Sequence, residues 1–228
     1  MTTDVVFLIP ADQPTAQDFI GPWEVFCRWM DVRRHVVSST KGRLVCDTGV
    51  VIEATESLDE VSHADIIVVP GTSKPFEAIR DKAAVDWLRK VAPGATWITS
   101  VCTGAGVLAA AGLLTGKKAT THWAFRDDLA SMGVDVVTDR VVFADNVVTG
   151  AGIMAGVDMA LELSLRQLGR EMTEAIQLSL EYDPCPPTDS GSLEKASPAV
   201  RKFVGDMFQA MVDAARPADW AGPGEVRG

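Results

Sequence analysis

Histidine, cysteine and tyrosine are all scarce in this chain: of 228 residues, three are histidine, four are cysteine and one is tyrosine. The cysteines are Cys27, Cys46, Cys102 and Cys185. Their spacing matches no zinc-binding pattern, and a chain of this length needs no disulfide bonds to stabilise its core. We therefore expect free thiols, and a cysteine in a special setting is a candidate nucleophile.

Basic clusters, targeting signals and long apolar runs are also lacking. Asp and Glu outnumber Lys and Arg by 31 to 21, which gives a net charge of −10 with no local group of basic residues. This charge argues against nucleic acid or an anionic membrane as a partner. The longest apolar run, 107–114, contains Gly112 and is far shorter than the ~20 residues that span a bilayer. The N-terminus has an acid before a short apolar run and no basic segment, so we expect a cytoplasmic protein.

What the chain does contain is enough apolar sequence for a large core, since 47% of its residues are hydrophobic and 23% are charged. Short, continuous apolar segments such as 65–69 alternate with segments of helical periodicity. Continuous apolar segments are typical of parallel strands that helices cover on both faces. The pattern predicts a single α/β domain over residues 1–228, built on a doubly wound, mainly parallel sheet.

The expected elements follow from these patterns and from the turn residues between them. Strands are expected over residues 5–9, 35–39, 65–69, 95–100, 118–121, 134–137, 141–143 and 147–149, with a hairpin over 44–53. Helices are expected over 75–90, 107–111, 123–132, 154–168 and 171–180, after a first helix that starts between 18 and 22 with Pro22 in its first turn. A Pro-rich connector over 183–192 then leads to a helix over 198–215 and a frayed tail over 217–228.

Cys102 lies in the sequence T-S-V-C-T-G-A-G, after a buried strand and before a helix of small residues. This order is typical of a nucleophile elbow. The unpaired N–H groups and the positive dipole end of such a helix favour a thiolate, and residues 104–106 carry almost no side chain that would cover the sulfur. The alternative is a buried structural cysteine, an interpretation that suits Cys27 and Cys46 better, while Cys185 fits a loop.

A cysteine nucleophile needs a proton donor or acceptor nearby. His35 and His63 fit ordinary surface positions, whereas His122 ends the run K-A-T-T-H near a strand end and either lines the site or is a structural histidine. Asp18 and Gly71 both follow predicted strands, and the carboxyl ends of parallel strands meet at one crevice. We therefore expect both to lie near the cysteine. The alternative for Asp18 is a helix N-cap.

Six motifs in order make the chain similar to the ThiJ/PfpI superfamily, and most of all to its isocyanide hydratase branch. They are D-F-I-G-P-W-E-V-F from Asp18, D-I-I-V-V-P-G from Asp65, S-V-C-T-G from Ser100, A-A-G-L-L-T-G-K-K-A-T-T-H-W from Ala110, V-T-G-A-G-I-M-A-G-V-D from Val148 and L-E-Y-D-P-C-P-P from Leu180. The resemblance covers roughly residues 5–187. It implies a flavodoxin-like fold with a nucleophilic cysteine at an elbow.

The resemblance also implies roles for individual residues. Cys102 matches the nucleophile of the superfamily, and Asp18 matches the acid that touches it. Thr103 matches the residue after the nucleophile, whose backbone N–H helps to bind an anionic intermediate. Ile153, which follows Gly152 in the G-A-G-I motif, matches a residue whose backbone lies against the cysteine.

The chain departs from the superfamily pattern after the third strand, where Pro-Gly-Thr replaces Pro-Gly-Gly. If the N–H groups of Gly71 and Thr72 help to bind an anion, Thr72 must adopt a geometry that glycine reaches more easily. The loop over 10–17 is also longer than expected. Thr103 stands where protease-like members have histidine, and H-W-A from His122 lacks the His-x-Glu of glutamine amidotransferases. Both differences disfavour peptidase and ammonia-releasing chemistry.

The resemblance implies hydration of an isocyanide to an N-substituted formamide. Cys102 would form a thioimidate with the substrate, and Asp18 would act first as general acid and then as general base. The substrate would be a small, neutral organic molecule, and no metal or organic cofactor is implied. Two alternatives stay open: a glyoxalase- or deglycase-like enzyme acting on reactive carbonyls, and a non-enzymatic ligand- or redox-sensing domain.

The helix expected over 198–215 carries an apolar stripe. Its large members are Phe203, Met207, Phe208 and Met211. The stripe either covers the core of its own chain or crosses to a second subunit. The resemblance implies a homodimer.

Overall fold

A seven-stranded sheet forms the centre of the protein in the computed structural model, which describes residues 2–10 and 13–220. The strand order is β10-β11-β7-β6-β1-β2-β5, and every neighbouring pair is parallel except β10 with β11. The strands are β1 (Thr3–Leu8), β2 (Val32–Ser38), β5 (Glu56–Ser57), β6 (Ile66–Val69), β7 (Trp97–Val101), β10 (Val141–Ala144) and β11 (Val147–Gly150). The predicted mainly parallel sheet is confirmed.

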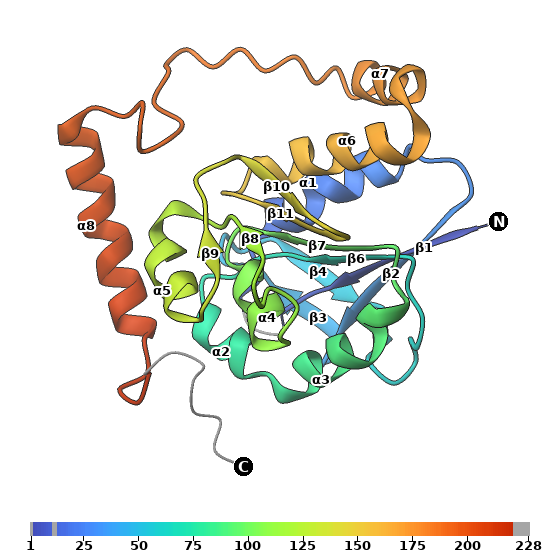
Figure 1. Cartoon of the computed structure of the whole chain (residues 1–228), viewed down its shortest axis with the longest axis horizontal. Helices are drawn as coiled ribbons and strands as arrows, with labels where there is room; N and C mark the ends of the chain where they lie inside the picture. Colours follow the sequence, from blue (N-terminus) through green and yellow to red (C-terminus); the bar gives the residue numbers. More distant parts are fainter. Residues whose placement is uncertain (1, 11–12, 221–228) are drawn as a thin grey trace.

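Helices cover both faces of this sheet (Figure 1). One face carries α1 (Ala16–Phe26) and α6 (Ala155–Leu168), which pack against each other. The other face carries α2 (Pro75–Arg80), α3 (Lys82–Val91) and α4 (Gly104–Ala110). The predicted doubly wound α/β arrangement is therefore confirmed, with α7 (Arg170–Ser179) packed beside α6.

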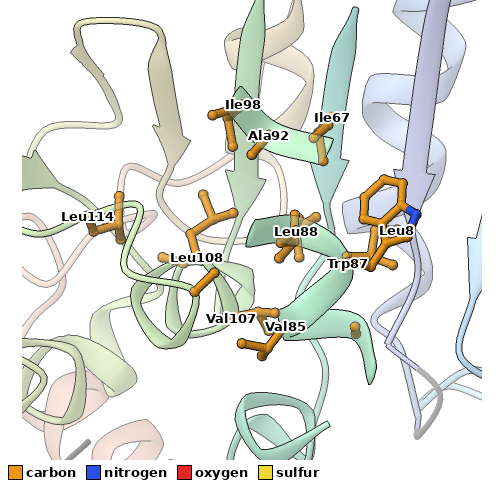
Figure 2. Packing of buried hydrophobic residues seen from close by; sticks show 14 of the residues in the cluster. Leu8, Ile67, Val85, Trp87, Leu88, Ala92, Ile98, Val107, Leu108 and Leu114 are labelled. Atoms are coloured by element: carbon orange, nitrogen blue, oxygen red, sulfur yellow. The ribbon is translucent and has the colours of Figure 1, made fainter. Parts of the chain in front are cut away.

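Two hydrophobic cores lie between the sheet and these two helical layers. Figure 2 shows part of the core under α3 and α4, where Ile67 and Ile98 of the sheet face Leu88 and Leu108 of the helices. Both leucines are fully buried, and burial of a leucine side chain stabilises the fold by roughly 1.5–3 kcal/mol. Trp87 at the rim of this core still finds a polar partner, because its Nε1–H donates to the carbonyl of Val61 at 2.7 Å.

The helix predicted over 75–90 is in fact two helices, α2 and α3, because Asp81 interrupts it. Asp81 has an extended ψ of 88°, and its carboxylate accepts a hydrogen bond from the N–H of Ala84 at 3.1 Å. The same carboxylate accepts from the Ser39 hydroxyl at 2.6 Å. Aspartate is a preferred N-cap, so Asp81 ends one helix and starts the next.

The first helix begins earlier than predicted, at Ala16, and Pro22 lies inside it instead of in its first turn. Thr15 fixes this start, because its N–H donates to the carbonyl of Gly71 and its hydroxyl to Asp47, both at 2.9 Å. Pro22 removes one helical hydrogen bond, yet its ring lies only 3.1 Å from where a Cβ on Gly156 of α6 would be. The proline is thus part of the α1–α6 contact.

Two small two-stranded sheets lie outside the main sheet. The predicted hairpin is confirmed as the antiparallel pair β3 (Gly42–Val45) and β4 (Val51–Ala54). The strands predicted over 118–121 and 134–137 form the short parallel pair β8 (Lys118–Ala119) and β9 (Asp135–Val136). Between them the predicted helix over 123–132 starts as a 3-10 turn, η2 (Trp123–Phe125), before α5 (Arg126–Ser131).

The C-terminal helix α8 (Pro198–Ala215) has the predicted bounds and stands beside the domain core (Figure 1). Just after it, Arg216 pairs with Asp128 and Trp220 packs edge-on against Phe76 with ring centroids 4.8 Å apart. The rest of the predicted tail, 221–228, lies outside the described residues. Among the described residues, no helix has the length and apolarity that crossing a bilayer requires.

Candidate active site

Cys102 occupies a sharp turn between β7, which ends at Val101, and α4, which begins at Gly104. Its φ of +57° is unusual for a residue with a side chain, and three hydrogen bonds hold it there. Its N–H donates to the carbonyls of Gly150 at 3.1 Å and Ala151 at 2.8 Å. Its own carbonyl accepts from the Thr121 hydroxyl at 2.7 Å. The predicted strand–cysteine–helix elbow is present in the structure.

The small residues after Cys102 let α4 approach the sheet closely. A Cβ added to Gly104 would lie 2.2 Å from the carbonyl oxygen of Val69 and 2.9 Å from that of Pro70, distances that no packed carbon reaches. Glycine is therefore required for this contact. The close approach brings the end of β6 next to the cysteine turn.

Asp18 lies in the first turn of α1 and is completely buried. Its Oδ2 accepts a hydrogen bond from the N–H of Gly71 at 2.9 Å, so it does not cap its own helix, which follows Thr15. Its Oδ1 is also buried and accepts no N–H or O–H bond from the described residues. The thiol of Cys102 lies close enough to interact with this carboxyl and to influence its pKa.

The two groups shift each other's protonation. Burial raises the pKa of the Asp18 carboxyl from 3.8 to about 7, although the Gly71 N–H and the Cys102 side chain both act to lower it. Burial, followed by the negative charge of Asp18, raises the pKa of the Cys102 thiol, and the Thr103 N–H acts in the opposite direction. The lowered thiol pKa expected from the helix start is thus outweighed by burial. Two such groups titrate as a pair, which holds two protons below about pH 7 and one proton above it.

The loop after β6 is tied to the loop after the cysteine. The N–H of Thr72 donates to the Thr103 hydroxyl at 2.9 Å, and that hydroxyl donates to the carbonyl of Thr72 at 3.0 Å. Thr72 is not among the residues with a positive φ, so the threonine that replaces glycine fits its position without backbone strain. The N–H groups of Gly71 and Thr72 are both bonded to protein atoms here, to Asp18 and to Thr103.

His122 and Gly152 lie on the other side of the cysteine turn. A Cβ on Gly152 would be 3.1 Å from Cδ2 of His122, so the imidazole lies against this glycine. The Nδ1 of His122 accepts from the N–H of Ala124 at 3.3 Å, and burial lowers the pKa of the imidazole to about 4. Ile153 follows with a side chain that is 38% exposed. In this structure the carbonyls that accept from the Cys102 N–H are those of the preceding residues, Gly150 and Ala151.

The sequence did not single out Thr121, although it lies in the same motif as His122. Its hydroxyl donates to the Cys102 carbonyl. The position of Thr121 directly before a candidate site histidine could have indicated that it belongs to the site. Asp47 was also missed as a neighbour. Its negative charge raises the pKa of Asp18 and of Cys102, and no local pattern places the β3–β4 turn near the cysteine.

The remaining cysteines form no disulfide, and the other two histidines pair with carboxylates. All four cysteines are free. His35 pairs with Glu56 at 2.8 Å and His63 with Asp65 at 3.3 Å. His63, Asp65 and Asp4 are close enough together to bind a metal ion, within 4.8 Å. They lie at the amino ends of β1 and β6, opposite the cysteine, and Arg33 already donates to both Asp4 oxygens at 2.6 and 2.8 Å.

A cysteine elbow at the carboxyl edge of a doubly wound parallel sheet, with a buried carboxyl beside the sulfur, defines a class of cysteine-centred α/β proteins. Residues 3–165 match the model of the DJ-1/PfpI family, and the chain belongs to this family. The resemblance to the ThiJ/PfpI superfamily inferred from the sequence is confirmed.

Known relatives agree with this assignment. The chain is 42% identical over 183 residues to isonitrile hydratase from Pseudomonas putida, an alignment covering 80% of each protein. It is 29% identical over 114 residues to deglycase PfpI from Pyrococcus furiosus, covering 49% of this chain and 69% of the relative. The crystal structure of a ThiJ/PfpI family protein from Pseudomonas syringae superposes with a TM-score of 0.88 at 31% identity, covering 94% of this chain and 91% of that one.

Proposed function

We propose that this chain is an isocyanide hydratase, which adds water to R–N≡C and yields R–NH–CHO. The observation that carries the proposal is the buried pair of Asp18 and Cys102, in which the carboxyl has its pKa raised to about 7 and can both donate and accept a proton near neutral pH. The 42% identity to the isonitrile hydratase of Pseudomonas putida supports the substrate class. The reaction requires no metal or organic cofactor.

The first half of the proposed reaction forms a covalent bond to Cys102. The thiolate attacks the terminal carbon of R–N≡C, and the Asp18 carboxyl gives its proton to that carbon, which produces the thioimidate R–N=CH–S. The Thr103 N–H faces the sulfur and lowers the pKa of the thiol, so it is placed to stabilise negative charge during the attack. The Gly71 N–H is bonded to Asp18 at 2.9 Å, and we assign it to orienting this carboxyl.

The second half hydrolyses the thioimidate. The Asp18 carboxylate accepts a proton from water while the water oxygen attacks the thioimidate carbon, and the C–S bond then breaks. The product R–N=CH–OH tautomerises to the formamide, and the pair is left with the single proton that it had at the start. One water molecule is consumed for each isocyanide.

Purified protein incubated with a panel of aryl and alkyl isocyanides tests the proposal, with formamide formation followed by absorbance. We expect turnover with the unmodified chain and none with Cys102→Ala. Absence of turnover across the panel would reject the substrate class. Turnover by Cys102→Ala would instead reject the covalent mechanism while leaving the substrate class intact.

A second candidate function is deglycase-like chemistry on reactive carbonyls, which the 29% identity to deglycase PfpI favours. The same cysteine would attack the carbonyl carbon. Consumption of methylglyoxal with no turnover of isocyanides would establish this alternative. A redox sensor is less favoured, because burial raises the pKa of Cys102 and a protonated, buried thiol oxidises slowly.

We further propose that residues 1–228 form one domain that acts in the cytoplasm as a homodimer on a small neutral molecule. The outer face of α8 supports self-association, since four of its apolar side chains are 44–73% exposed: Val200, Phe203, Met207 and Met211. Sedimentation analysis should give the mass of two chains. We expect Met207→Glu to shift the equilibrium toward a single chain, and a wild-type monomer at all concentrations would reject the dimer.

A further inference from the structure

Phe208 joins α8 to the neighbourhood of the cysteine. Its ring lies 5.0 Å from the ring of His122 and 5.2 Å from that of Trp123, and these two are themselves 5.2 Å apart. Such separations are typical of favourable aromatic packing. The large apolar residues on the outer face of the same helix, among them Phe203, are exposed. Phe208 is thus the aromatic residue through which α8 reaches the domain near Cys102.

The imidazole that Phe208 covers connects to both sides of the cysteine turn. On one side its Cδ2 lies against Gly152, directly after Ala151, whose carbonyl accepts from the Cys102 N–H at 2.8 Å. On the other side the preceding residue, Thr121, donates its hydroxyl to the Cys102 carbonyl at 2.7 Å. A change in the position of this ring therefore displaces the groups that hydrogen-bond to the N–H and to the carbonyl of Cys102.

The imidazole ring of His122 is held in place mainly by the residues that pack against it. Burial, then the charge of Arg126, lowers the pKa of the imidazole to about 4, so it is neutral at physiological pH. Its Nδ1 accepts from Ala124 at 3.3 Å, so the proton is on Nε2. Without a charged partner, a ring is held chiefly by the surfaces it packs against, which here are Gly152, Trp123 and Phe208.

We infer that Phe208 is a positioning residue for Cys102: from the C-terminal helix, its ring holds His122 against Gly152 and so fixes the turn that carries the nucleophile. The inference rests on the proposed role of Cys102 as the reacting group. It assigns α8 a structural role within its own chain, separate from any contact with a second subunit. It also predicts that a residue 106 positions away from the cysteine in sequence controls how the thiol reacts.

The test compares Phe208→Ala with Gln209→Ala, a truncation at the neighbouring, exposed position of the same helix. Two readouts are measured: isocyanide turnover, and the pH-dependent rate at which iodoacetamide alkylates Cys102, followed by peptide mass spectrometry. For Phe208→Ala we expect kcat to fall by about tenfold with little change in KM, because misplacing a reacting group by about 1 Å costs up to roughly a hundredfold in rate. We also expect its Cys102 alkylation profile to shift to lower pH, since water enters beside the thiol.

Two further variants separate positioning from folding. Phe208→Tyr keeps the ring and should restore both readouts to within about twofold, and Gln209→Ala should match the wild type. Phe208→Leu keeps most of the volume without the ring, so it reports on stacking even if Phe208→Ala fails to fold. An alkylation profile for Phe208→Leu identical to that of the wild type overturns the inference. Because alkylation needs no isocyanide, it remains decisive even if the proposed hydration is absent.

Discussion

At the scale of single residues, Asp18 and Cys102 form a buried pair in which the pKa of each group is raised. The sequence predicted that these two residues meet, because both follow parallel strands and both belong to motifs of the DJ-1/PfpI family. It did not predict the direction of the thiol pKa, because that direction depends on the burial of Cys102, which is only 6% exposed, and on the charge of Asp18. Burial and charge at this site arise from tertiary contacts that local patterns do not encode.

The raised pKa of Asp18 contributes stability that falls as the pH rises, whereas the lowered pKa of His122 contributes stability that rises with pH. The carboxyl titrates at 3.8 when unfolded and at about 7 when folded, so between these values unfolding releases a proton. The stability that this proton contributes is present below about pH 4 and is lost as the pH rises through 7, up to roughly 4 kcal/mol in all. We expect the free energy of unfolding to change more positively between pH 5 and pH 8 in Asp18→Asn than in the wild type, measured by urea unfolding at the two pH values.

A contrasting variant checks the sign of this effect. The hydrogen bond from Arg33 lowers the pKa of Asp4, so Asp4→Asn should remove stability that is present at neutral pH and is lost only in acid. Equal pH profiles for the wild type and Asp18→Asn would show that the Asp18 carboxyl has an ordinary pKa.

The same proton should govern the rate of the proposed reaction. Below about pH 7 both groups are protonated, and the pair cannot supply a thiolate. As the pH rises through 7 one proton is lost, and the singly protonated pair is the reactive form. We expect kcat/KM for an isocyanide to rise with an apparent pKa near 7 and to stay high until the second proton is lost. A rate independent of pH between 5.5 and 8.5 would disagree with this assignment.

At the scale of elements, the sequence predicted the strands and most helices because apolar periodicity determines them directly. The errors lie where a tertiary contact decides the boundary. Asp81 divides one predicted helix because its carboxylate binds both Ala84 and Ser39. The first helix starts at Ala16 because Thr15 is bonded to Gly71 and Asp47. Ala84 is a local partner of Asp81, but Ser39, Gly71 and Asp47 lie far away in sequence, so no local pattern identifies these three contacts.

Two glycine-to-alanine substitutions, one at the contact between α4 and β6 and one in α8, should have opposite effects on stability. A Cβ on Gly104 would lie 2.2 Å from the Val69 carbonyl oxygen, whereas one on Gly205 in α8 meets nothing within 4 Å. We expect Gly104→Ala to destabilise the fold by about 1–3 kcal/mol and to reduce turnover. Gly205→Ala should stabilise it by roughly 0.5–1 kcal/mol. Thermal unfolding of both variants checks the pair, and equal melting temperatures would refute the steric argument.

At the scale of the whole molecule, the segment after α8 is attached to the domain through Arg216. Its guanidinium donates to the Asp128 carboxylate at 2.9 and 3.1 Å, and Asp128 is only 7% exposed. We expect Arg216→Ala to cost about 1–3 kcal/mol, because it leaves a buried carboxylate without its partner. Lys202→Ala, which breaks an exposed pair with Asp206, should cost less than about 1 kcal/mol. Limited proteolysis within the connector, 183–192, should accelerate only in the first variant.

The site around Cys102 gathers residues from chain positions as distant as 18, 71, 121 and 151. During synthesis Asp18 therefore stays hydrated and ionised until more than half of the chain has emerged and closed around it. The carboxyl then takes up a proton that the unfolded chain does not hold at neutral pH. Burial of Asp18 is consequently accompanied by proton uptake, and on refolding in weak buffer near pH 6 the wild type should take up about one proton more than Asp18→Asn, in step with burial of the cysteine.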